Sequence, residues 1–314
     1  MAQMTALSAV KIARQDPDTI VAAGELVDLR FVSGNALSLR AAKLFCLLIQ
    51  EAGISVAEDK QHRIPYAVLN ETFHKSRSEL ADAIAELHNT VVSVQLVSRQ
   101  GRPYTKSGPI LSDVEREPDS LDDAEIRFEF SKTMRRVIAD STHWASISRR
   151  AVMSFESRYS LRLYLWLSLR ANLRKTAEDV SLDDLRGLLG VTGGKLVNWQ
   201  HLKSRALDPA IAEINHLAGF HASFMPLKQG RRVAGVRFAW SLKNHDDLVK
   251  AQKELDRPRV GRKARRAGLV ETIAQERFRL AESLANAPGI DLTNPERLGR
   301  SEMGSEAPRP DGEM

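Results

Sequence analysis

Side chains that can hydrogen-bond to DNA are concentrated in one short stretch of the second half of the sequence. The stretch contains Asn198, Gln200, His201, Lys203, Ser204 and Arg205. Amide side chains suit adenine, guanidinium and ammonium groups suit guanine, and a serine hydroxyl is permissive. If the stretch opens the second helix of a helix-turn-helix, these groups face base edges or phosphates in the major groove. The alternative is a solvated helix face with no ligand.

A second basic group follows at the tip of an expected hairpin. Lys228, Arg231 and Arg232 surround Gly230, between two stretches that alternate as strands do. Phosphate contacts from such a tip, or wing, supply affinity and salt dependence but carry no sequence information.

The first half contains a weaker version of the same pattern. Its expected second helix opens with Lys75, Ser76 and Arg77, and its expected hairpin tip carries Arg99 and Arg102. These residues lie in an acidic half of the chain. We therefore expect them either to contact DNA or to belong to a domain that mediates dimerisation.

The sequence lacks the motifs of enzymes and metal sites. Gly193-Gly194-Lys195 resembles part of a phosphate-binding loop, but Leu189 and Leu196 replace the required glycine and Ser/Thr. The eight histidines include no closely spaced metal-binding pair, and no Gly-x-Ser-x-Gly elbow is present. The single cysteine, Cys46, excludes an internal disulfide and a multi-cysteine zinc site, and its apolar setting predicts a buried helix position. We expect no catalytic activity, no cofactor and no metal.

The charge of the chain is distributed unevenly. The 314 residues have a net charge of +6 and a pI of about 9.5. The balance is −3 over 1–142, +7 over 143–249, +6 over 250–266 and −4 over 267–314. This asymmetry favours a nucleic-acid-binding second half, although exposed basic residues could equally serve only solubility. No apolar run reaches the ~20 residues of a membrane helix, and the N-terminus lacks a signal-peptide core, so we expect a cytoplasmic protein without membrane contact.

Hydrophobic periodicity predicts the elements that would position these residues. In the first half we expect a helix over 36–51, an extended piece over 62–65, helices over 66–73 and about 78–90, and strands over 91–98 and 126–130. The acidic segment 113–123 between the two strands is expected to be a solvated loop. The second half is expected to contain helices over 159–170, 182–189 and 198–217, then strands over 220–227 and 233–242. Leucines alternate over 161–169 as in a strand, but leucine and arginine favour helix and apolar residues cover almost every face.

The two halves also share short motifs in the same order. Ser38-Leu39-Arg40 recurs as Ser160-Leu161-Arg162, and Ala83–Leu87 recurs as Ala210–Ile214, at offsets of 122 and 127 residues. We therefore predict an α+β fold of two tandem winged helix-turn-helix domains related by an internal repeat. The expected organisation is a flexible N-terminus (1–24), an N-terminal winged helix (25–142), a C-terminal winged helix that is the main DNA-binding domain (143–249), and a basic linker, short helix and disordered tail (250–314).

Four motifs of the second half carry a resemblance to a known family. The segments Tyr159–Tyr164, Val180–Gly190, Leu202–Asn215 and Lys228–Phe238 resemble the iteron-binding replication initiators of theta-replicating bacterial plasmids. The resemblance spans roughly residues 25–245 and is looser in the first half. It places the family's base-reading stretch on Asn198 to Arg205.

The resemblance implies an activity and a set of partners. It implies a monomer that binds origin direct repeats (iterons) in double-stranded DNA with both domains, helps to open the duplex, and recruits the host initiator and replicative helicase. It also implies a homodimer that binds an operator inverted repeat and represses its own gene. A transcriptional regulator without origin function is the alternative.

Overall fold

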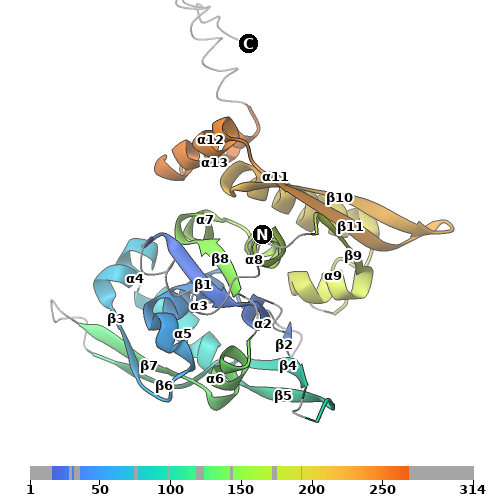
Figure 1. Cartoon of the computed structure of the whole chain (residues 1–314). Coiled ribbons are helices and arrows are strands. Elements are labelled where there is room, and N and C mark those ends of the chain that lie inside the picture. Colours follow the sequence, from blue (N-terminus) through green and yellow to red (C-terminus); the bar gives the residue numbers. More distant parts are fainter. Residues whose placement is uncertain are drawn as a thin grey trace, which may run out of the picture. The chain divides into compact units, whose positions relative to one another are not determined.

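The structure is a computed structural model that describes residues 16–27, 30–31, 36–73, 77–97, 100–117, 124–141, 144–171, 175–191 and 193–268. The chain forms two compact units, Met1–Arg262 and Lys263–Met314. The first unit contains both expected winged helices and is coloured from blue to orange in Figure 1. The expected helix over 271–285 and the expected disordered tail lie outside the described residues.

The first winged helix begins with the expected succession of helices. Its elements are α3 (Leu39–Ala52), a 3-10 helix (Gly53–Ala57), β3 (His62–Pro65), α4 (Tyr66–Phe73) and α5 (Arg77–Asn89). The Ser38 hydroxyl caps α3 by accepting a hydrogen bond from the Ala41 backbone N–H. Most of α3 is buried, including Cys46, as its apolar setting predicted. This helix therefore forms the centre of the N-terminal core.

The hairpin of the first winged helix differs from the prediction. Strand β4 (Val91–Val97) pairs with β5 (Pro103–Pro109), and not with residues 126–130. The latter form β7 (Glu125–Phe130), which lies between β3 and β6 (Leu111–Arg116) in a second sheet. Strand β5 escaped prediction because its sequence, PYTKSGP, is mostly polar and exposed and lacks the alternation of a half-buried strand.

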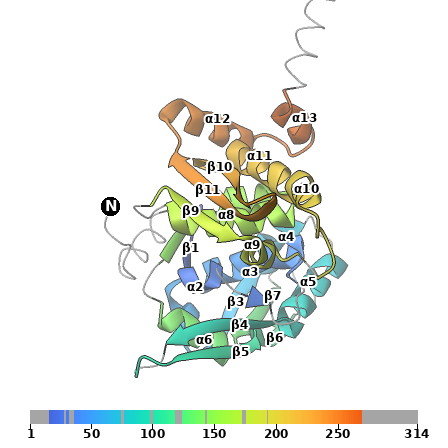
Figure 2. The same cartoon turned by 90° about the vertical axis from the view of Figure 1, so that its right-hand side faces the viewer.

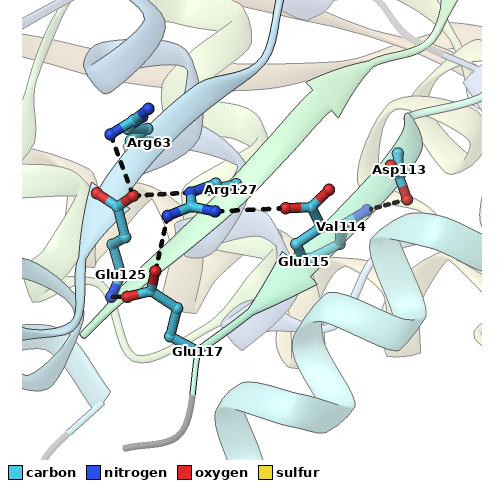
Figure 3. A network of polar contacts seen from close by, with 7 residues as sticks. All are labelled: Arg63, Asp113, Val114, Glu115, Glu117, Glu125 and Arg127. Carbon is cyan, nitrogen blue, oxygen red and sulfur yellow. Dashed lines mark hydrogen bonds and ion pairs between the residues drawn. The ribbon is translucent and has the colours of Figure 1, made fainter. Parts of the chain in front are cut away.

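The acidic segment expected to be a loop is partly a strand, because neighbouring arginines compensate its carboxylates. Figure 3 shows the guanidinium of Arg127, on β7, among Glu115, Glu117 and Glu125. Its Nη2 lies 2.7 Å from Glu117 Oε1, and its Nε lies 2.8 Å from Glu125 Oε1. Arg63 on β3 adds a contact of 3.4 Å to Glu125 Oε1. The pairing of Arg127 with Glu115 and Glu117 thus favours a strand in a segment with little apolar character.

Further elements complete the N-terminal part of the unit. They are β1 (Thr19–Ala23), α2 (Gly24–Val27), β2 (Arg30–Phe31), α6 (Lys132–Ala139), β8 (Trp144–Ser148) and α7 (Arg149–Ser154). Strand β1 pairs antiparallel with β8, and β2 pairs with β4. Residues 19–23 therefore belong to a sheet, although the sequence placed them in a flexible N-terminus. Their partner strand lies more than 120 residues further along the chain, and no local pattern predicts such a pairing.

The second winged helix follows the predicted order closely. Its elements are α8 (Arg158–Ala171), β9 (Ala177–Ser181), α9 (Leu182–Leu189), α10 (Trp199–Leu202), a π-helical turn (Lys203–Leu207), α11 (Asp208–Leu217), β10 (Phe220–Gln229) and β11 (Arg232–Leu242). The alternating leucines of 161–169 do form a helix: Leu161, Leu163, Leu167 and Leu169 are all buried in α8. The strands order as β10-β11-β9, and Figure 1 shows β10 and β11 as a long hairpin.

The repeated motifs occupy corresponding helices in the two halves. Ser38–Arg40 opens α3 and Ser160–Arg162 lies in the first turn of α8, while Ala83–Leu87 lies in α5 and Ala210–Ile214 in α11. After β11 the chain forms α12 (His245–Asp256) and the short α13 (Arg262–Arg266), where the sequence indicated a charged linker or helix extension.

Candidate nucleic-acid interface

The helix-turn-helix of the second winged helix is built from local signals that the sequence displays. Ser181 caps α9, and its hydroxyl accepts from the Asp184 backbone N–H at 3.1 Å. Gly190 ends α9 in the left-handed region with φ +63°, and a side chain at this position would collide with Ala36. Asn198 then caps α10 by accepting from the Gln200 backbone N–H at 2.7 Å. Gly190 and Asn198 thus define the two ends of the turn that orients the second helix.

The second helix, from Asn198 to Leu217, is amphipathic in the expected sense. Leu202, Ala206 and Leu207 are fully buried, whereas Gln200, His201, Ser204 and Arg205 are exposed. We call this helix, made of α10, the π-helical turn and α11, the recognition helix. Its first two turns therefore present the predicted polar side chains to solvent and its leucines to the core.

The predicted polar residues of the recognition helix are not equally available to a ligand. The Lys203 ammonium lies 2.7 Å from Asp208 Oδ2, and the Ser204 hydroxyl donates to the Gln200 carbonyl at 2.8 Å. Asn198 Oδ1 is occupied by the cap. Within the described part of the chain, the side chains of Gln200, His201 and Arg205 have no polar partner. These three are the groups most open to base edges.

Aromatic packing fixes the recognition helix on the hairpin. The ring of Trp199 meets Phe224 of β10 edge-on, with centroids 6.5 Å apart, and Phe224 lies 6.3 Å from Phe238 of β11. In both Figure 1 and Figure 2 the hairpin lies beside α11. The helix and the hairpin therefore form one rigid surface.

The tip of this hairpin carries the expected cations. Lys228, Arg231 and Arg232 are exposed around Gly230, whose φ of +62° the tight turn requires. No carboxylate in the described residues pairs with any of the three. Further down the hairpin, Arg237 Nε lies 2.5 Å from Asp179 Oδ1, so its charge is already compensated. The tip is thus the positively charged end of the hairpin.

One exposed cation near the recognition helix was not among the DNA-contact residues predicted from the sequence. Lys195 is exposed in the turn between α9 and α10, next to Gly194 with φ +79°. In the sequence, Gly193-Gly194-Lys195 had been interpreted only as a partial phosphate-loop motif. Its position immediately before the Asn198 cap was the signal that could have placed it at the start of the recognition helix.

Few of the contact residues predicted for the first winged helix can be compared with the structure. Lys75, Ser76 and Arg99 lie outside the described residues, and Arg77 is described only as the first residue of α5. Arg102 is exposed immediately before β5. The DNA contact predicted for this set therefore stays a prediction.

No group of three or more His, Cys, Asp or Glu side chains among the described residues could hold a metal ion. No helix in the same ranges is long and apolar enough to cross a membrane.

Comparison with known families identifies both domains. Residues 20–168 match the family described as initiator replication protein, WH1, and residues 181–240 match initiator Rep protein, WH2. The chain belongs to the initiator Rep proteins. The family resemblance read from the sequence is therefore confirmed, as is the fold of two tandem winged helices. The Rep chain is accordingly a DNA-binding replication initiator.

Two solved structures resemble this Rep chain to different degrees. The crystal structure of Pi initiator protein in complex with iteron DNA aligns with a TM-score of 0.55 at 17% identity, covering 72% of this chain and 98% of that one. Domains 2 and 3 of RctB align with a TM-score of 0.41 at 10% identity, covering 65% and 80% of the two chains. Comparison with curated protein sequences gave no significant match.

Proposed function

We propose that this Rep chain initiates plasmid replication by binding direct repeats in the origin with both winged helices. The recognition helix reads bases through Gln200, His201 and Arg205 in the major groove, and the hairpin tip holds the adjacent phosphates. The observation that carries this proposal is that the recognition helix, which exposes those three side chains, packs through Trp199 on the same hairpin whose tip carries the uncompensated cations Lys228, Arg231 and Arg232. The chain also shares its fold with an initiator protein whose crystal structure is in complex with iteron DNA.

The proposal extends to the steps that follow binding. The bound monomer promotes opening of the neighbouring duplex and recruits the host initiator and the replicative helicase, and a homodimer binds an operator inverted repeat to repress its own gene. The protein does this as a binding protein without catalysis of its own. Membership of the Rep family and the tandem domain organisation support this part of the proposal.

Footprinting on the DNA that flanks the gene tests the proposal. We expect the purified chain to protect several direct repeats of about two helical turns each, and Arg205→Ala to weaken that protection. Protection of a single palindrome alone would instead indicate a transcriptional regulator. Nicking or hydrolysis of the same DNA that depends on a metal ion or ATP would contradict the non-catalytic role.

A further inference from the structure

The connection between α7 and α8 is where the chain passes from the N-terminal part into the second winged helix. Helix α7 packs on α3 of the first winged helix, and α8 packs on α9 and α11 of the second. Only residues 155–157 separate α7 from α8, and Phe155 is buried against Tyr164 with ring centroids 4.9 Å apart. This short connection, together with the packing of α8 on β8, α2 and α3, therefore contributes to how the two winged helices are oriented.

Three buried charged side chains converge on the backbone at this connection. Lys43 of α3 donates from Nζ to the Met153 carbonyl at 2.8 Å. Arg262 donates from Nη1 to the Ser154 carbonyl at 3.0 Å. Glu213 of α11 accepts from the Glu156 backbone N–H at 2.7 Å. One side chain comes from each winged helix and the third comes from the segment that follows the second.

The backbone groups that these side chains satisfy are ones that the fold leaves without a partner. The last carbonyls of a helix have no intrahelical donor, and Met153 and Ser154 are the last two residues of α7. Both residues are buried, so water cannot take the place of a protein donor. The two cations therefore complete the C-terminus of α7.

Arg262 is held by more than its contact with α7. Its side chain is 1% exposed, its Nε donates to Glu254 Oε1 at 3.1 Å and its Nη2 donates to the Glu254 carbonyl at 3.3 Å. Glu254 is itself buried on α12, which packs against both α7 and α11. Figure 1 shows α7 between α3 and α12. A buried charge needs all these partners at once, so it specifies one arrangement of the elements that supply them.

We infer that the segment His245–Arg262 fixes the orientation of the two winged helices for DNA binding, with Arg262 as its positioning residue. The segment acts as a strap: α12 lies on the second winged helix, and Arg262 reaches from its end to the connection. Two linked domains bind one DNA site strongly only when their geometry lets both engage together. This role rests on the proposed function, because binding of a repeat by both domains is what the fixed orientation serves.

Distances between the domains in the absence of DNA provide the first test. Spin labels are placed at two exposed positions, Thr105→Cys on β5 and Ser223→Cys on β10, in a Cys46→Ala background. Pulsed electron paramagnetic resonance then measures the distance between the two labels in the protein with the unchanged strap and in Arg262→Met. Lys263→Met, which removes one exposed neighbouring charge, is the matched control. We expect a narrow distance distribution for the unchanged strap and Lys263→Met, and a broad one for Arg262→Met. Superposable distributions for all three would overturn the inference.

DNA binding provides the second test, on the repeat duplex defined by the footprint. We expect Arg262→Met to lose about tenfold or more in affinity for the repeat and to protect a shorter stretch, while its affinity for an unrelated duplex is unchanged. Unchanged repeat binding in a variant with a broad distribution would overturn the role in DNA binding. If the unsubstituted chain binds no repeat, the proposed function fails, and the DNA-free distances still decide whether Arg262 sets the orientation.

A conservative variant covers the case in which Arg262→Met does not fold, as judged by circular dichroism. Arg262→Lys retains the charge, but its donors sit on a single nitrogen, which cannot occupy the separate positions from which Nε, Nη1 and Nη2 of Arg262 reach Glu254 and the Ser154 carbonyl. We expect a folded protein with a distribution of intermediate width. A distribution as narrow as that of the unchanged strap would overturn the requirement for the guanidinium.

Discussion

The Lys203 ammonium donates to both carboxylate oxygens of Asp208, at 3.0 and 2.7 Å, across the π-helical turn of the recognition helix. Arg205 lies on the same turn, is exposed, and has no ion-pair partner among the described residues. An ammonium held by a carboxylate is a poorer partner for a base or phosphate than a free guanidinium. The two cations that the sequence placed side by side are therefore not equivalent in the folded protein.

Arg205→Ala is expected to weaken binding to the repeat more than Lys203→Ala does. Loss of a base contact costs about 1–3 kcal/mol, or roughly 5- to 150-fold in affinity. Lys203 must first give up Asp208, so its net contribution is smaller. Titrations of both variants on the footprinted repeat and on an unrelated duplex measure the difference. If neither variant changes repeat affinity, the recognition helix has been assigned wrongly.

Asp208→Asn is expected to tighten DNA binding. The substitution removes a negative charge from the recognition helix and releases the Lys203 ammonium, a gain of about 1 kcal/mol or roughly fivefold in affinity. The control is the same substitution in a Lys203→Ala background, where only the gain from the removed charge remains. A double-mutant cycle on one duplex separates the two contributions. Equal gains in both backgrounds would show that the ion pair does not restrain Lys203.

The second winged helix was predictable from sequence because its determinants are local. Gly190, Asn198 and the alternating strands around Gly230 act within a few residues, and the structure places all of them as expected. The alternating leucines of α8 gave a misleading strand period. A helix that is buried on most faces loses its amphipathic pattern, so periodicity alone does not identify it. The helix propensity of leucine and arginine, and the helix expected for the matching first-half segment, pointed to the correct structure.

The first winged helix was less predictable because its pairings are long-range. Strand β1 pairs with β8, and β3 pairs with β7, so the sheets join segments far apart in the sequence. The pairing of Arg127 with Glu115 on β6 and with Glu117 just beyond it is a relationship visible only after folding. The pairing of Lys203 with Asp208 was hidden for a similar reason, since it depends on a π-helical turn that spacing alone does not indicate.

The double variant Arg231→Ala, Arg232→Ala is expected to lower affinity on every DNA sequence. Each lost phosphate contact should reduce the slope of log affinity against log salt concentration by about 0.9. The matched control, Lys60→Ala with Arg116→Ala, removes two exposed cations from the first winged helix outside the predicted contact set. Affinities measured from about 50 to 200 mM salt give the slopes. An unchanged slope in the hairpin variant would mean that the tip does not contact phosphate.

Cys46 is expected to be inert to thiol reagents in the folded protein. Burial raises the pKa of its thiol to about 12, and only a thiolate reacts. Because the chain has one cysteine, a colour-forming disulfide reagent at pH 8 should release no signal until denaturant is added. One equivalent of the coloured product per chain should then appear at once. Rapid labelling of the native protein would place Cys46 outside the core.

Lys43 is expected to make the stability of the protein rise with pH above neutrality. Burial, reinforced by the nearby Arg259, lowers the pKa of its ammonium from the ordinary 10.5 to about 8. Between these values the unfolded chain binds more protons than the folded one, so the free energy of unfolding increases with pH. The full shift corresponds to roughly 3 kcal/mol. This gain in the free energy of unfolding accumulates as pH rises from about 8 towards 10.5. Below pH 8, Lys43 is charged in the folded protein and its burial has its full cost.

Urea unfolding of the unsubstituted chain and of Lys43→Met, at intervals from pH 7 to 10, isolates this contribution. Other groups titrate in both proteins, so only the difference between their unfolding free energies reports on Lys43. That difference should change in favour of the unsubstituted chain as pH rises, because the cost of burying the charge of Lys43 disappears as it deprotonates, whereas methionine does not titrate. A difference independent of pH would mean that Lys43 keeps its ordinary pKa, and hence that the α7–α8 connection is open to water.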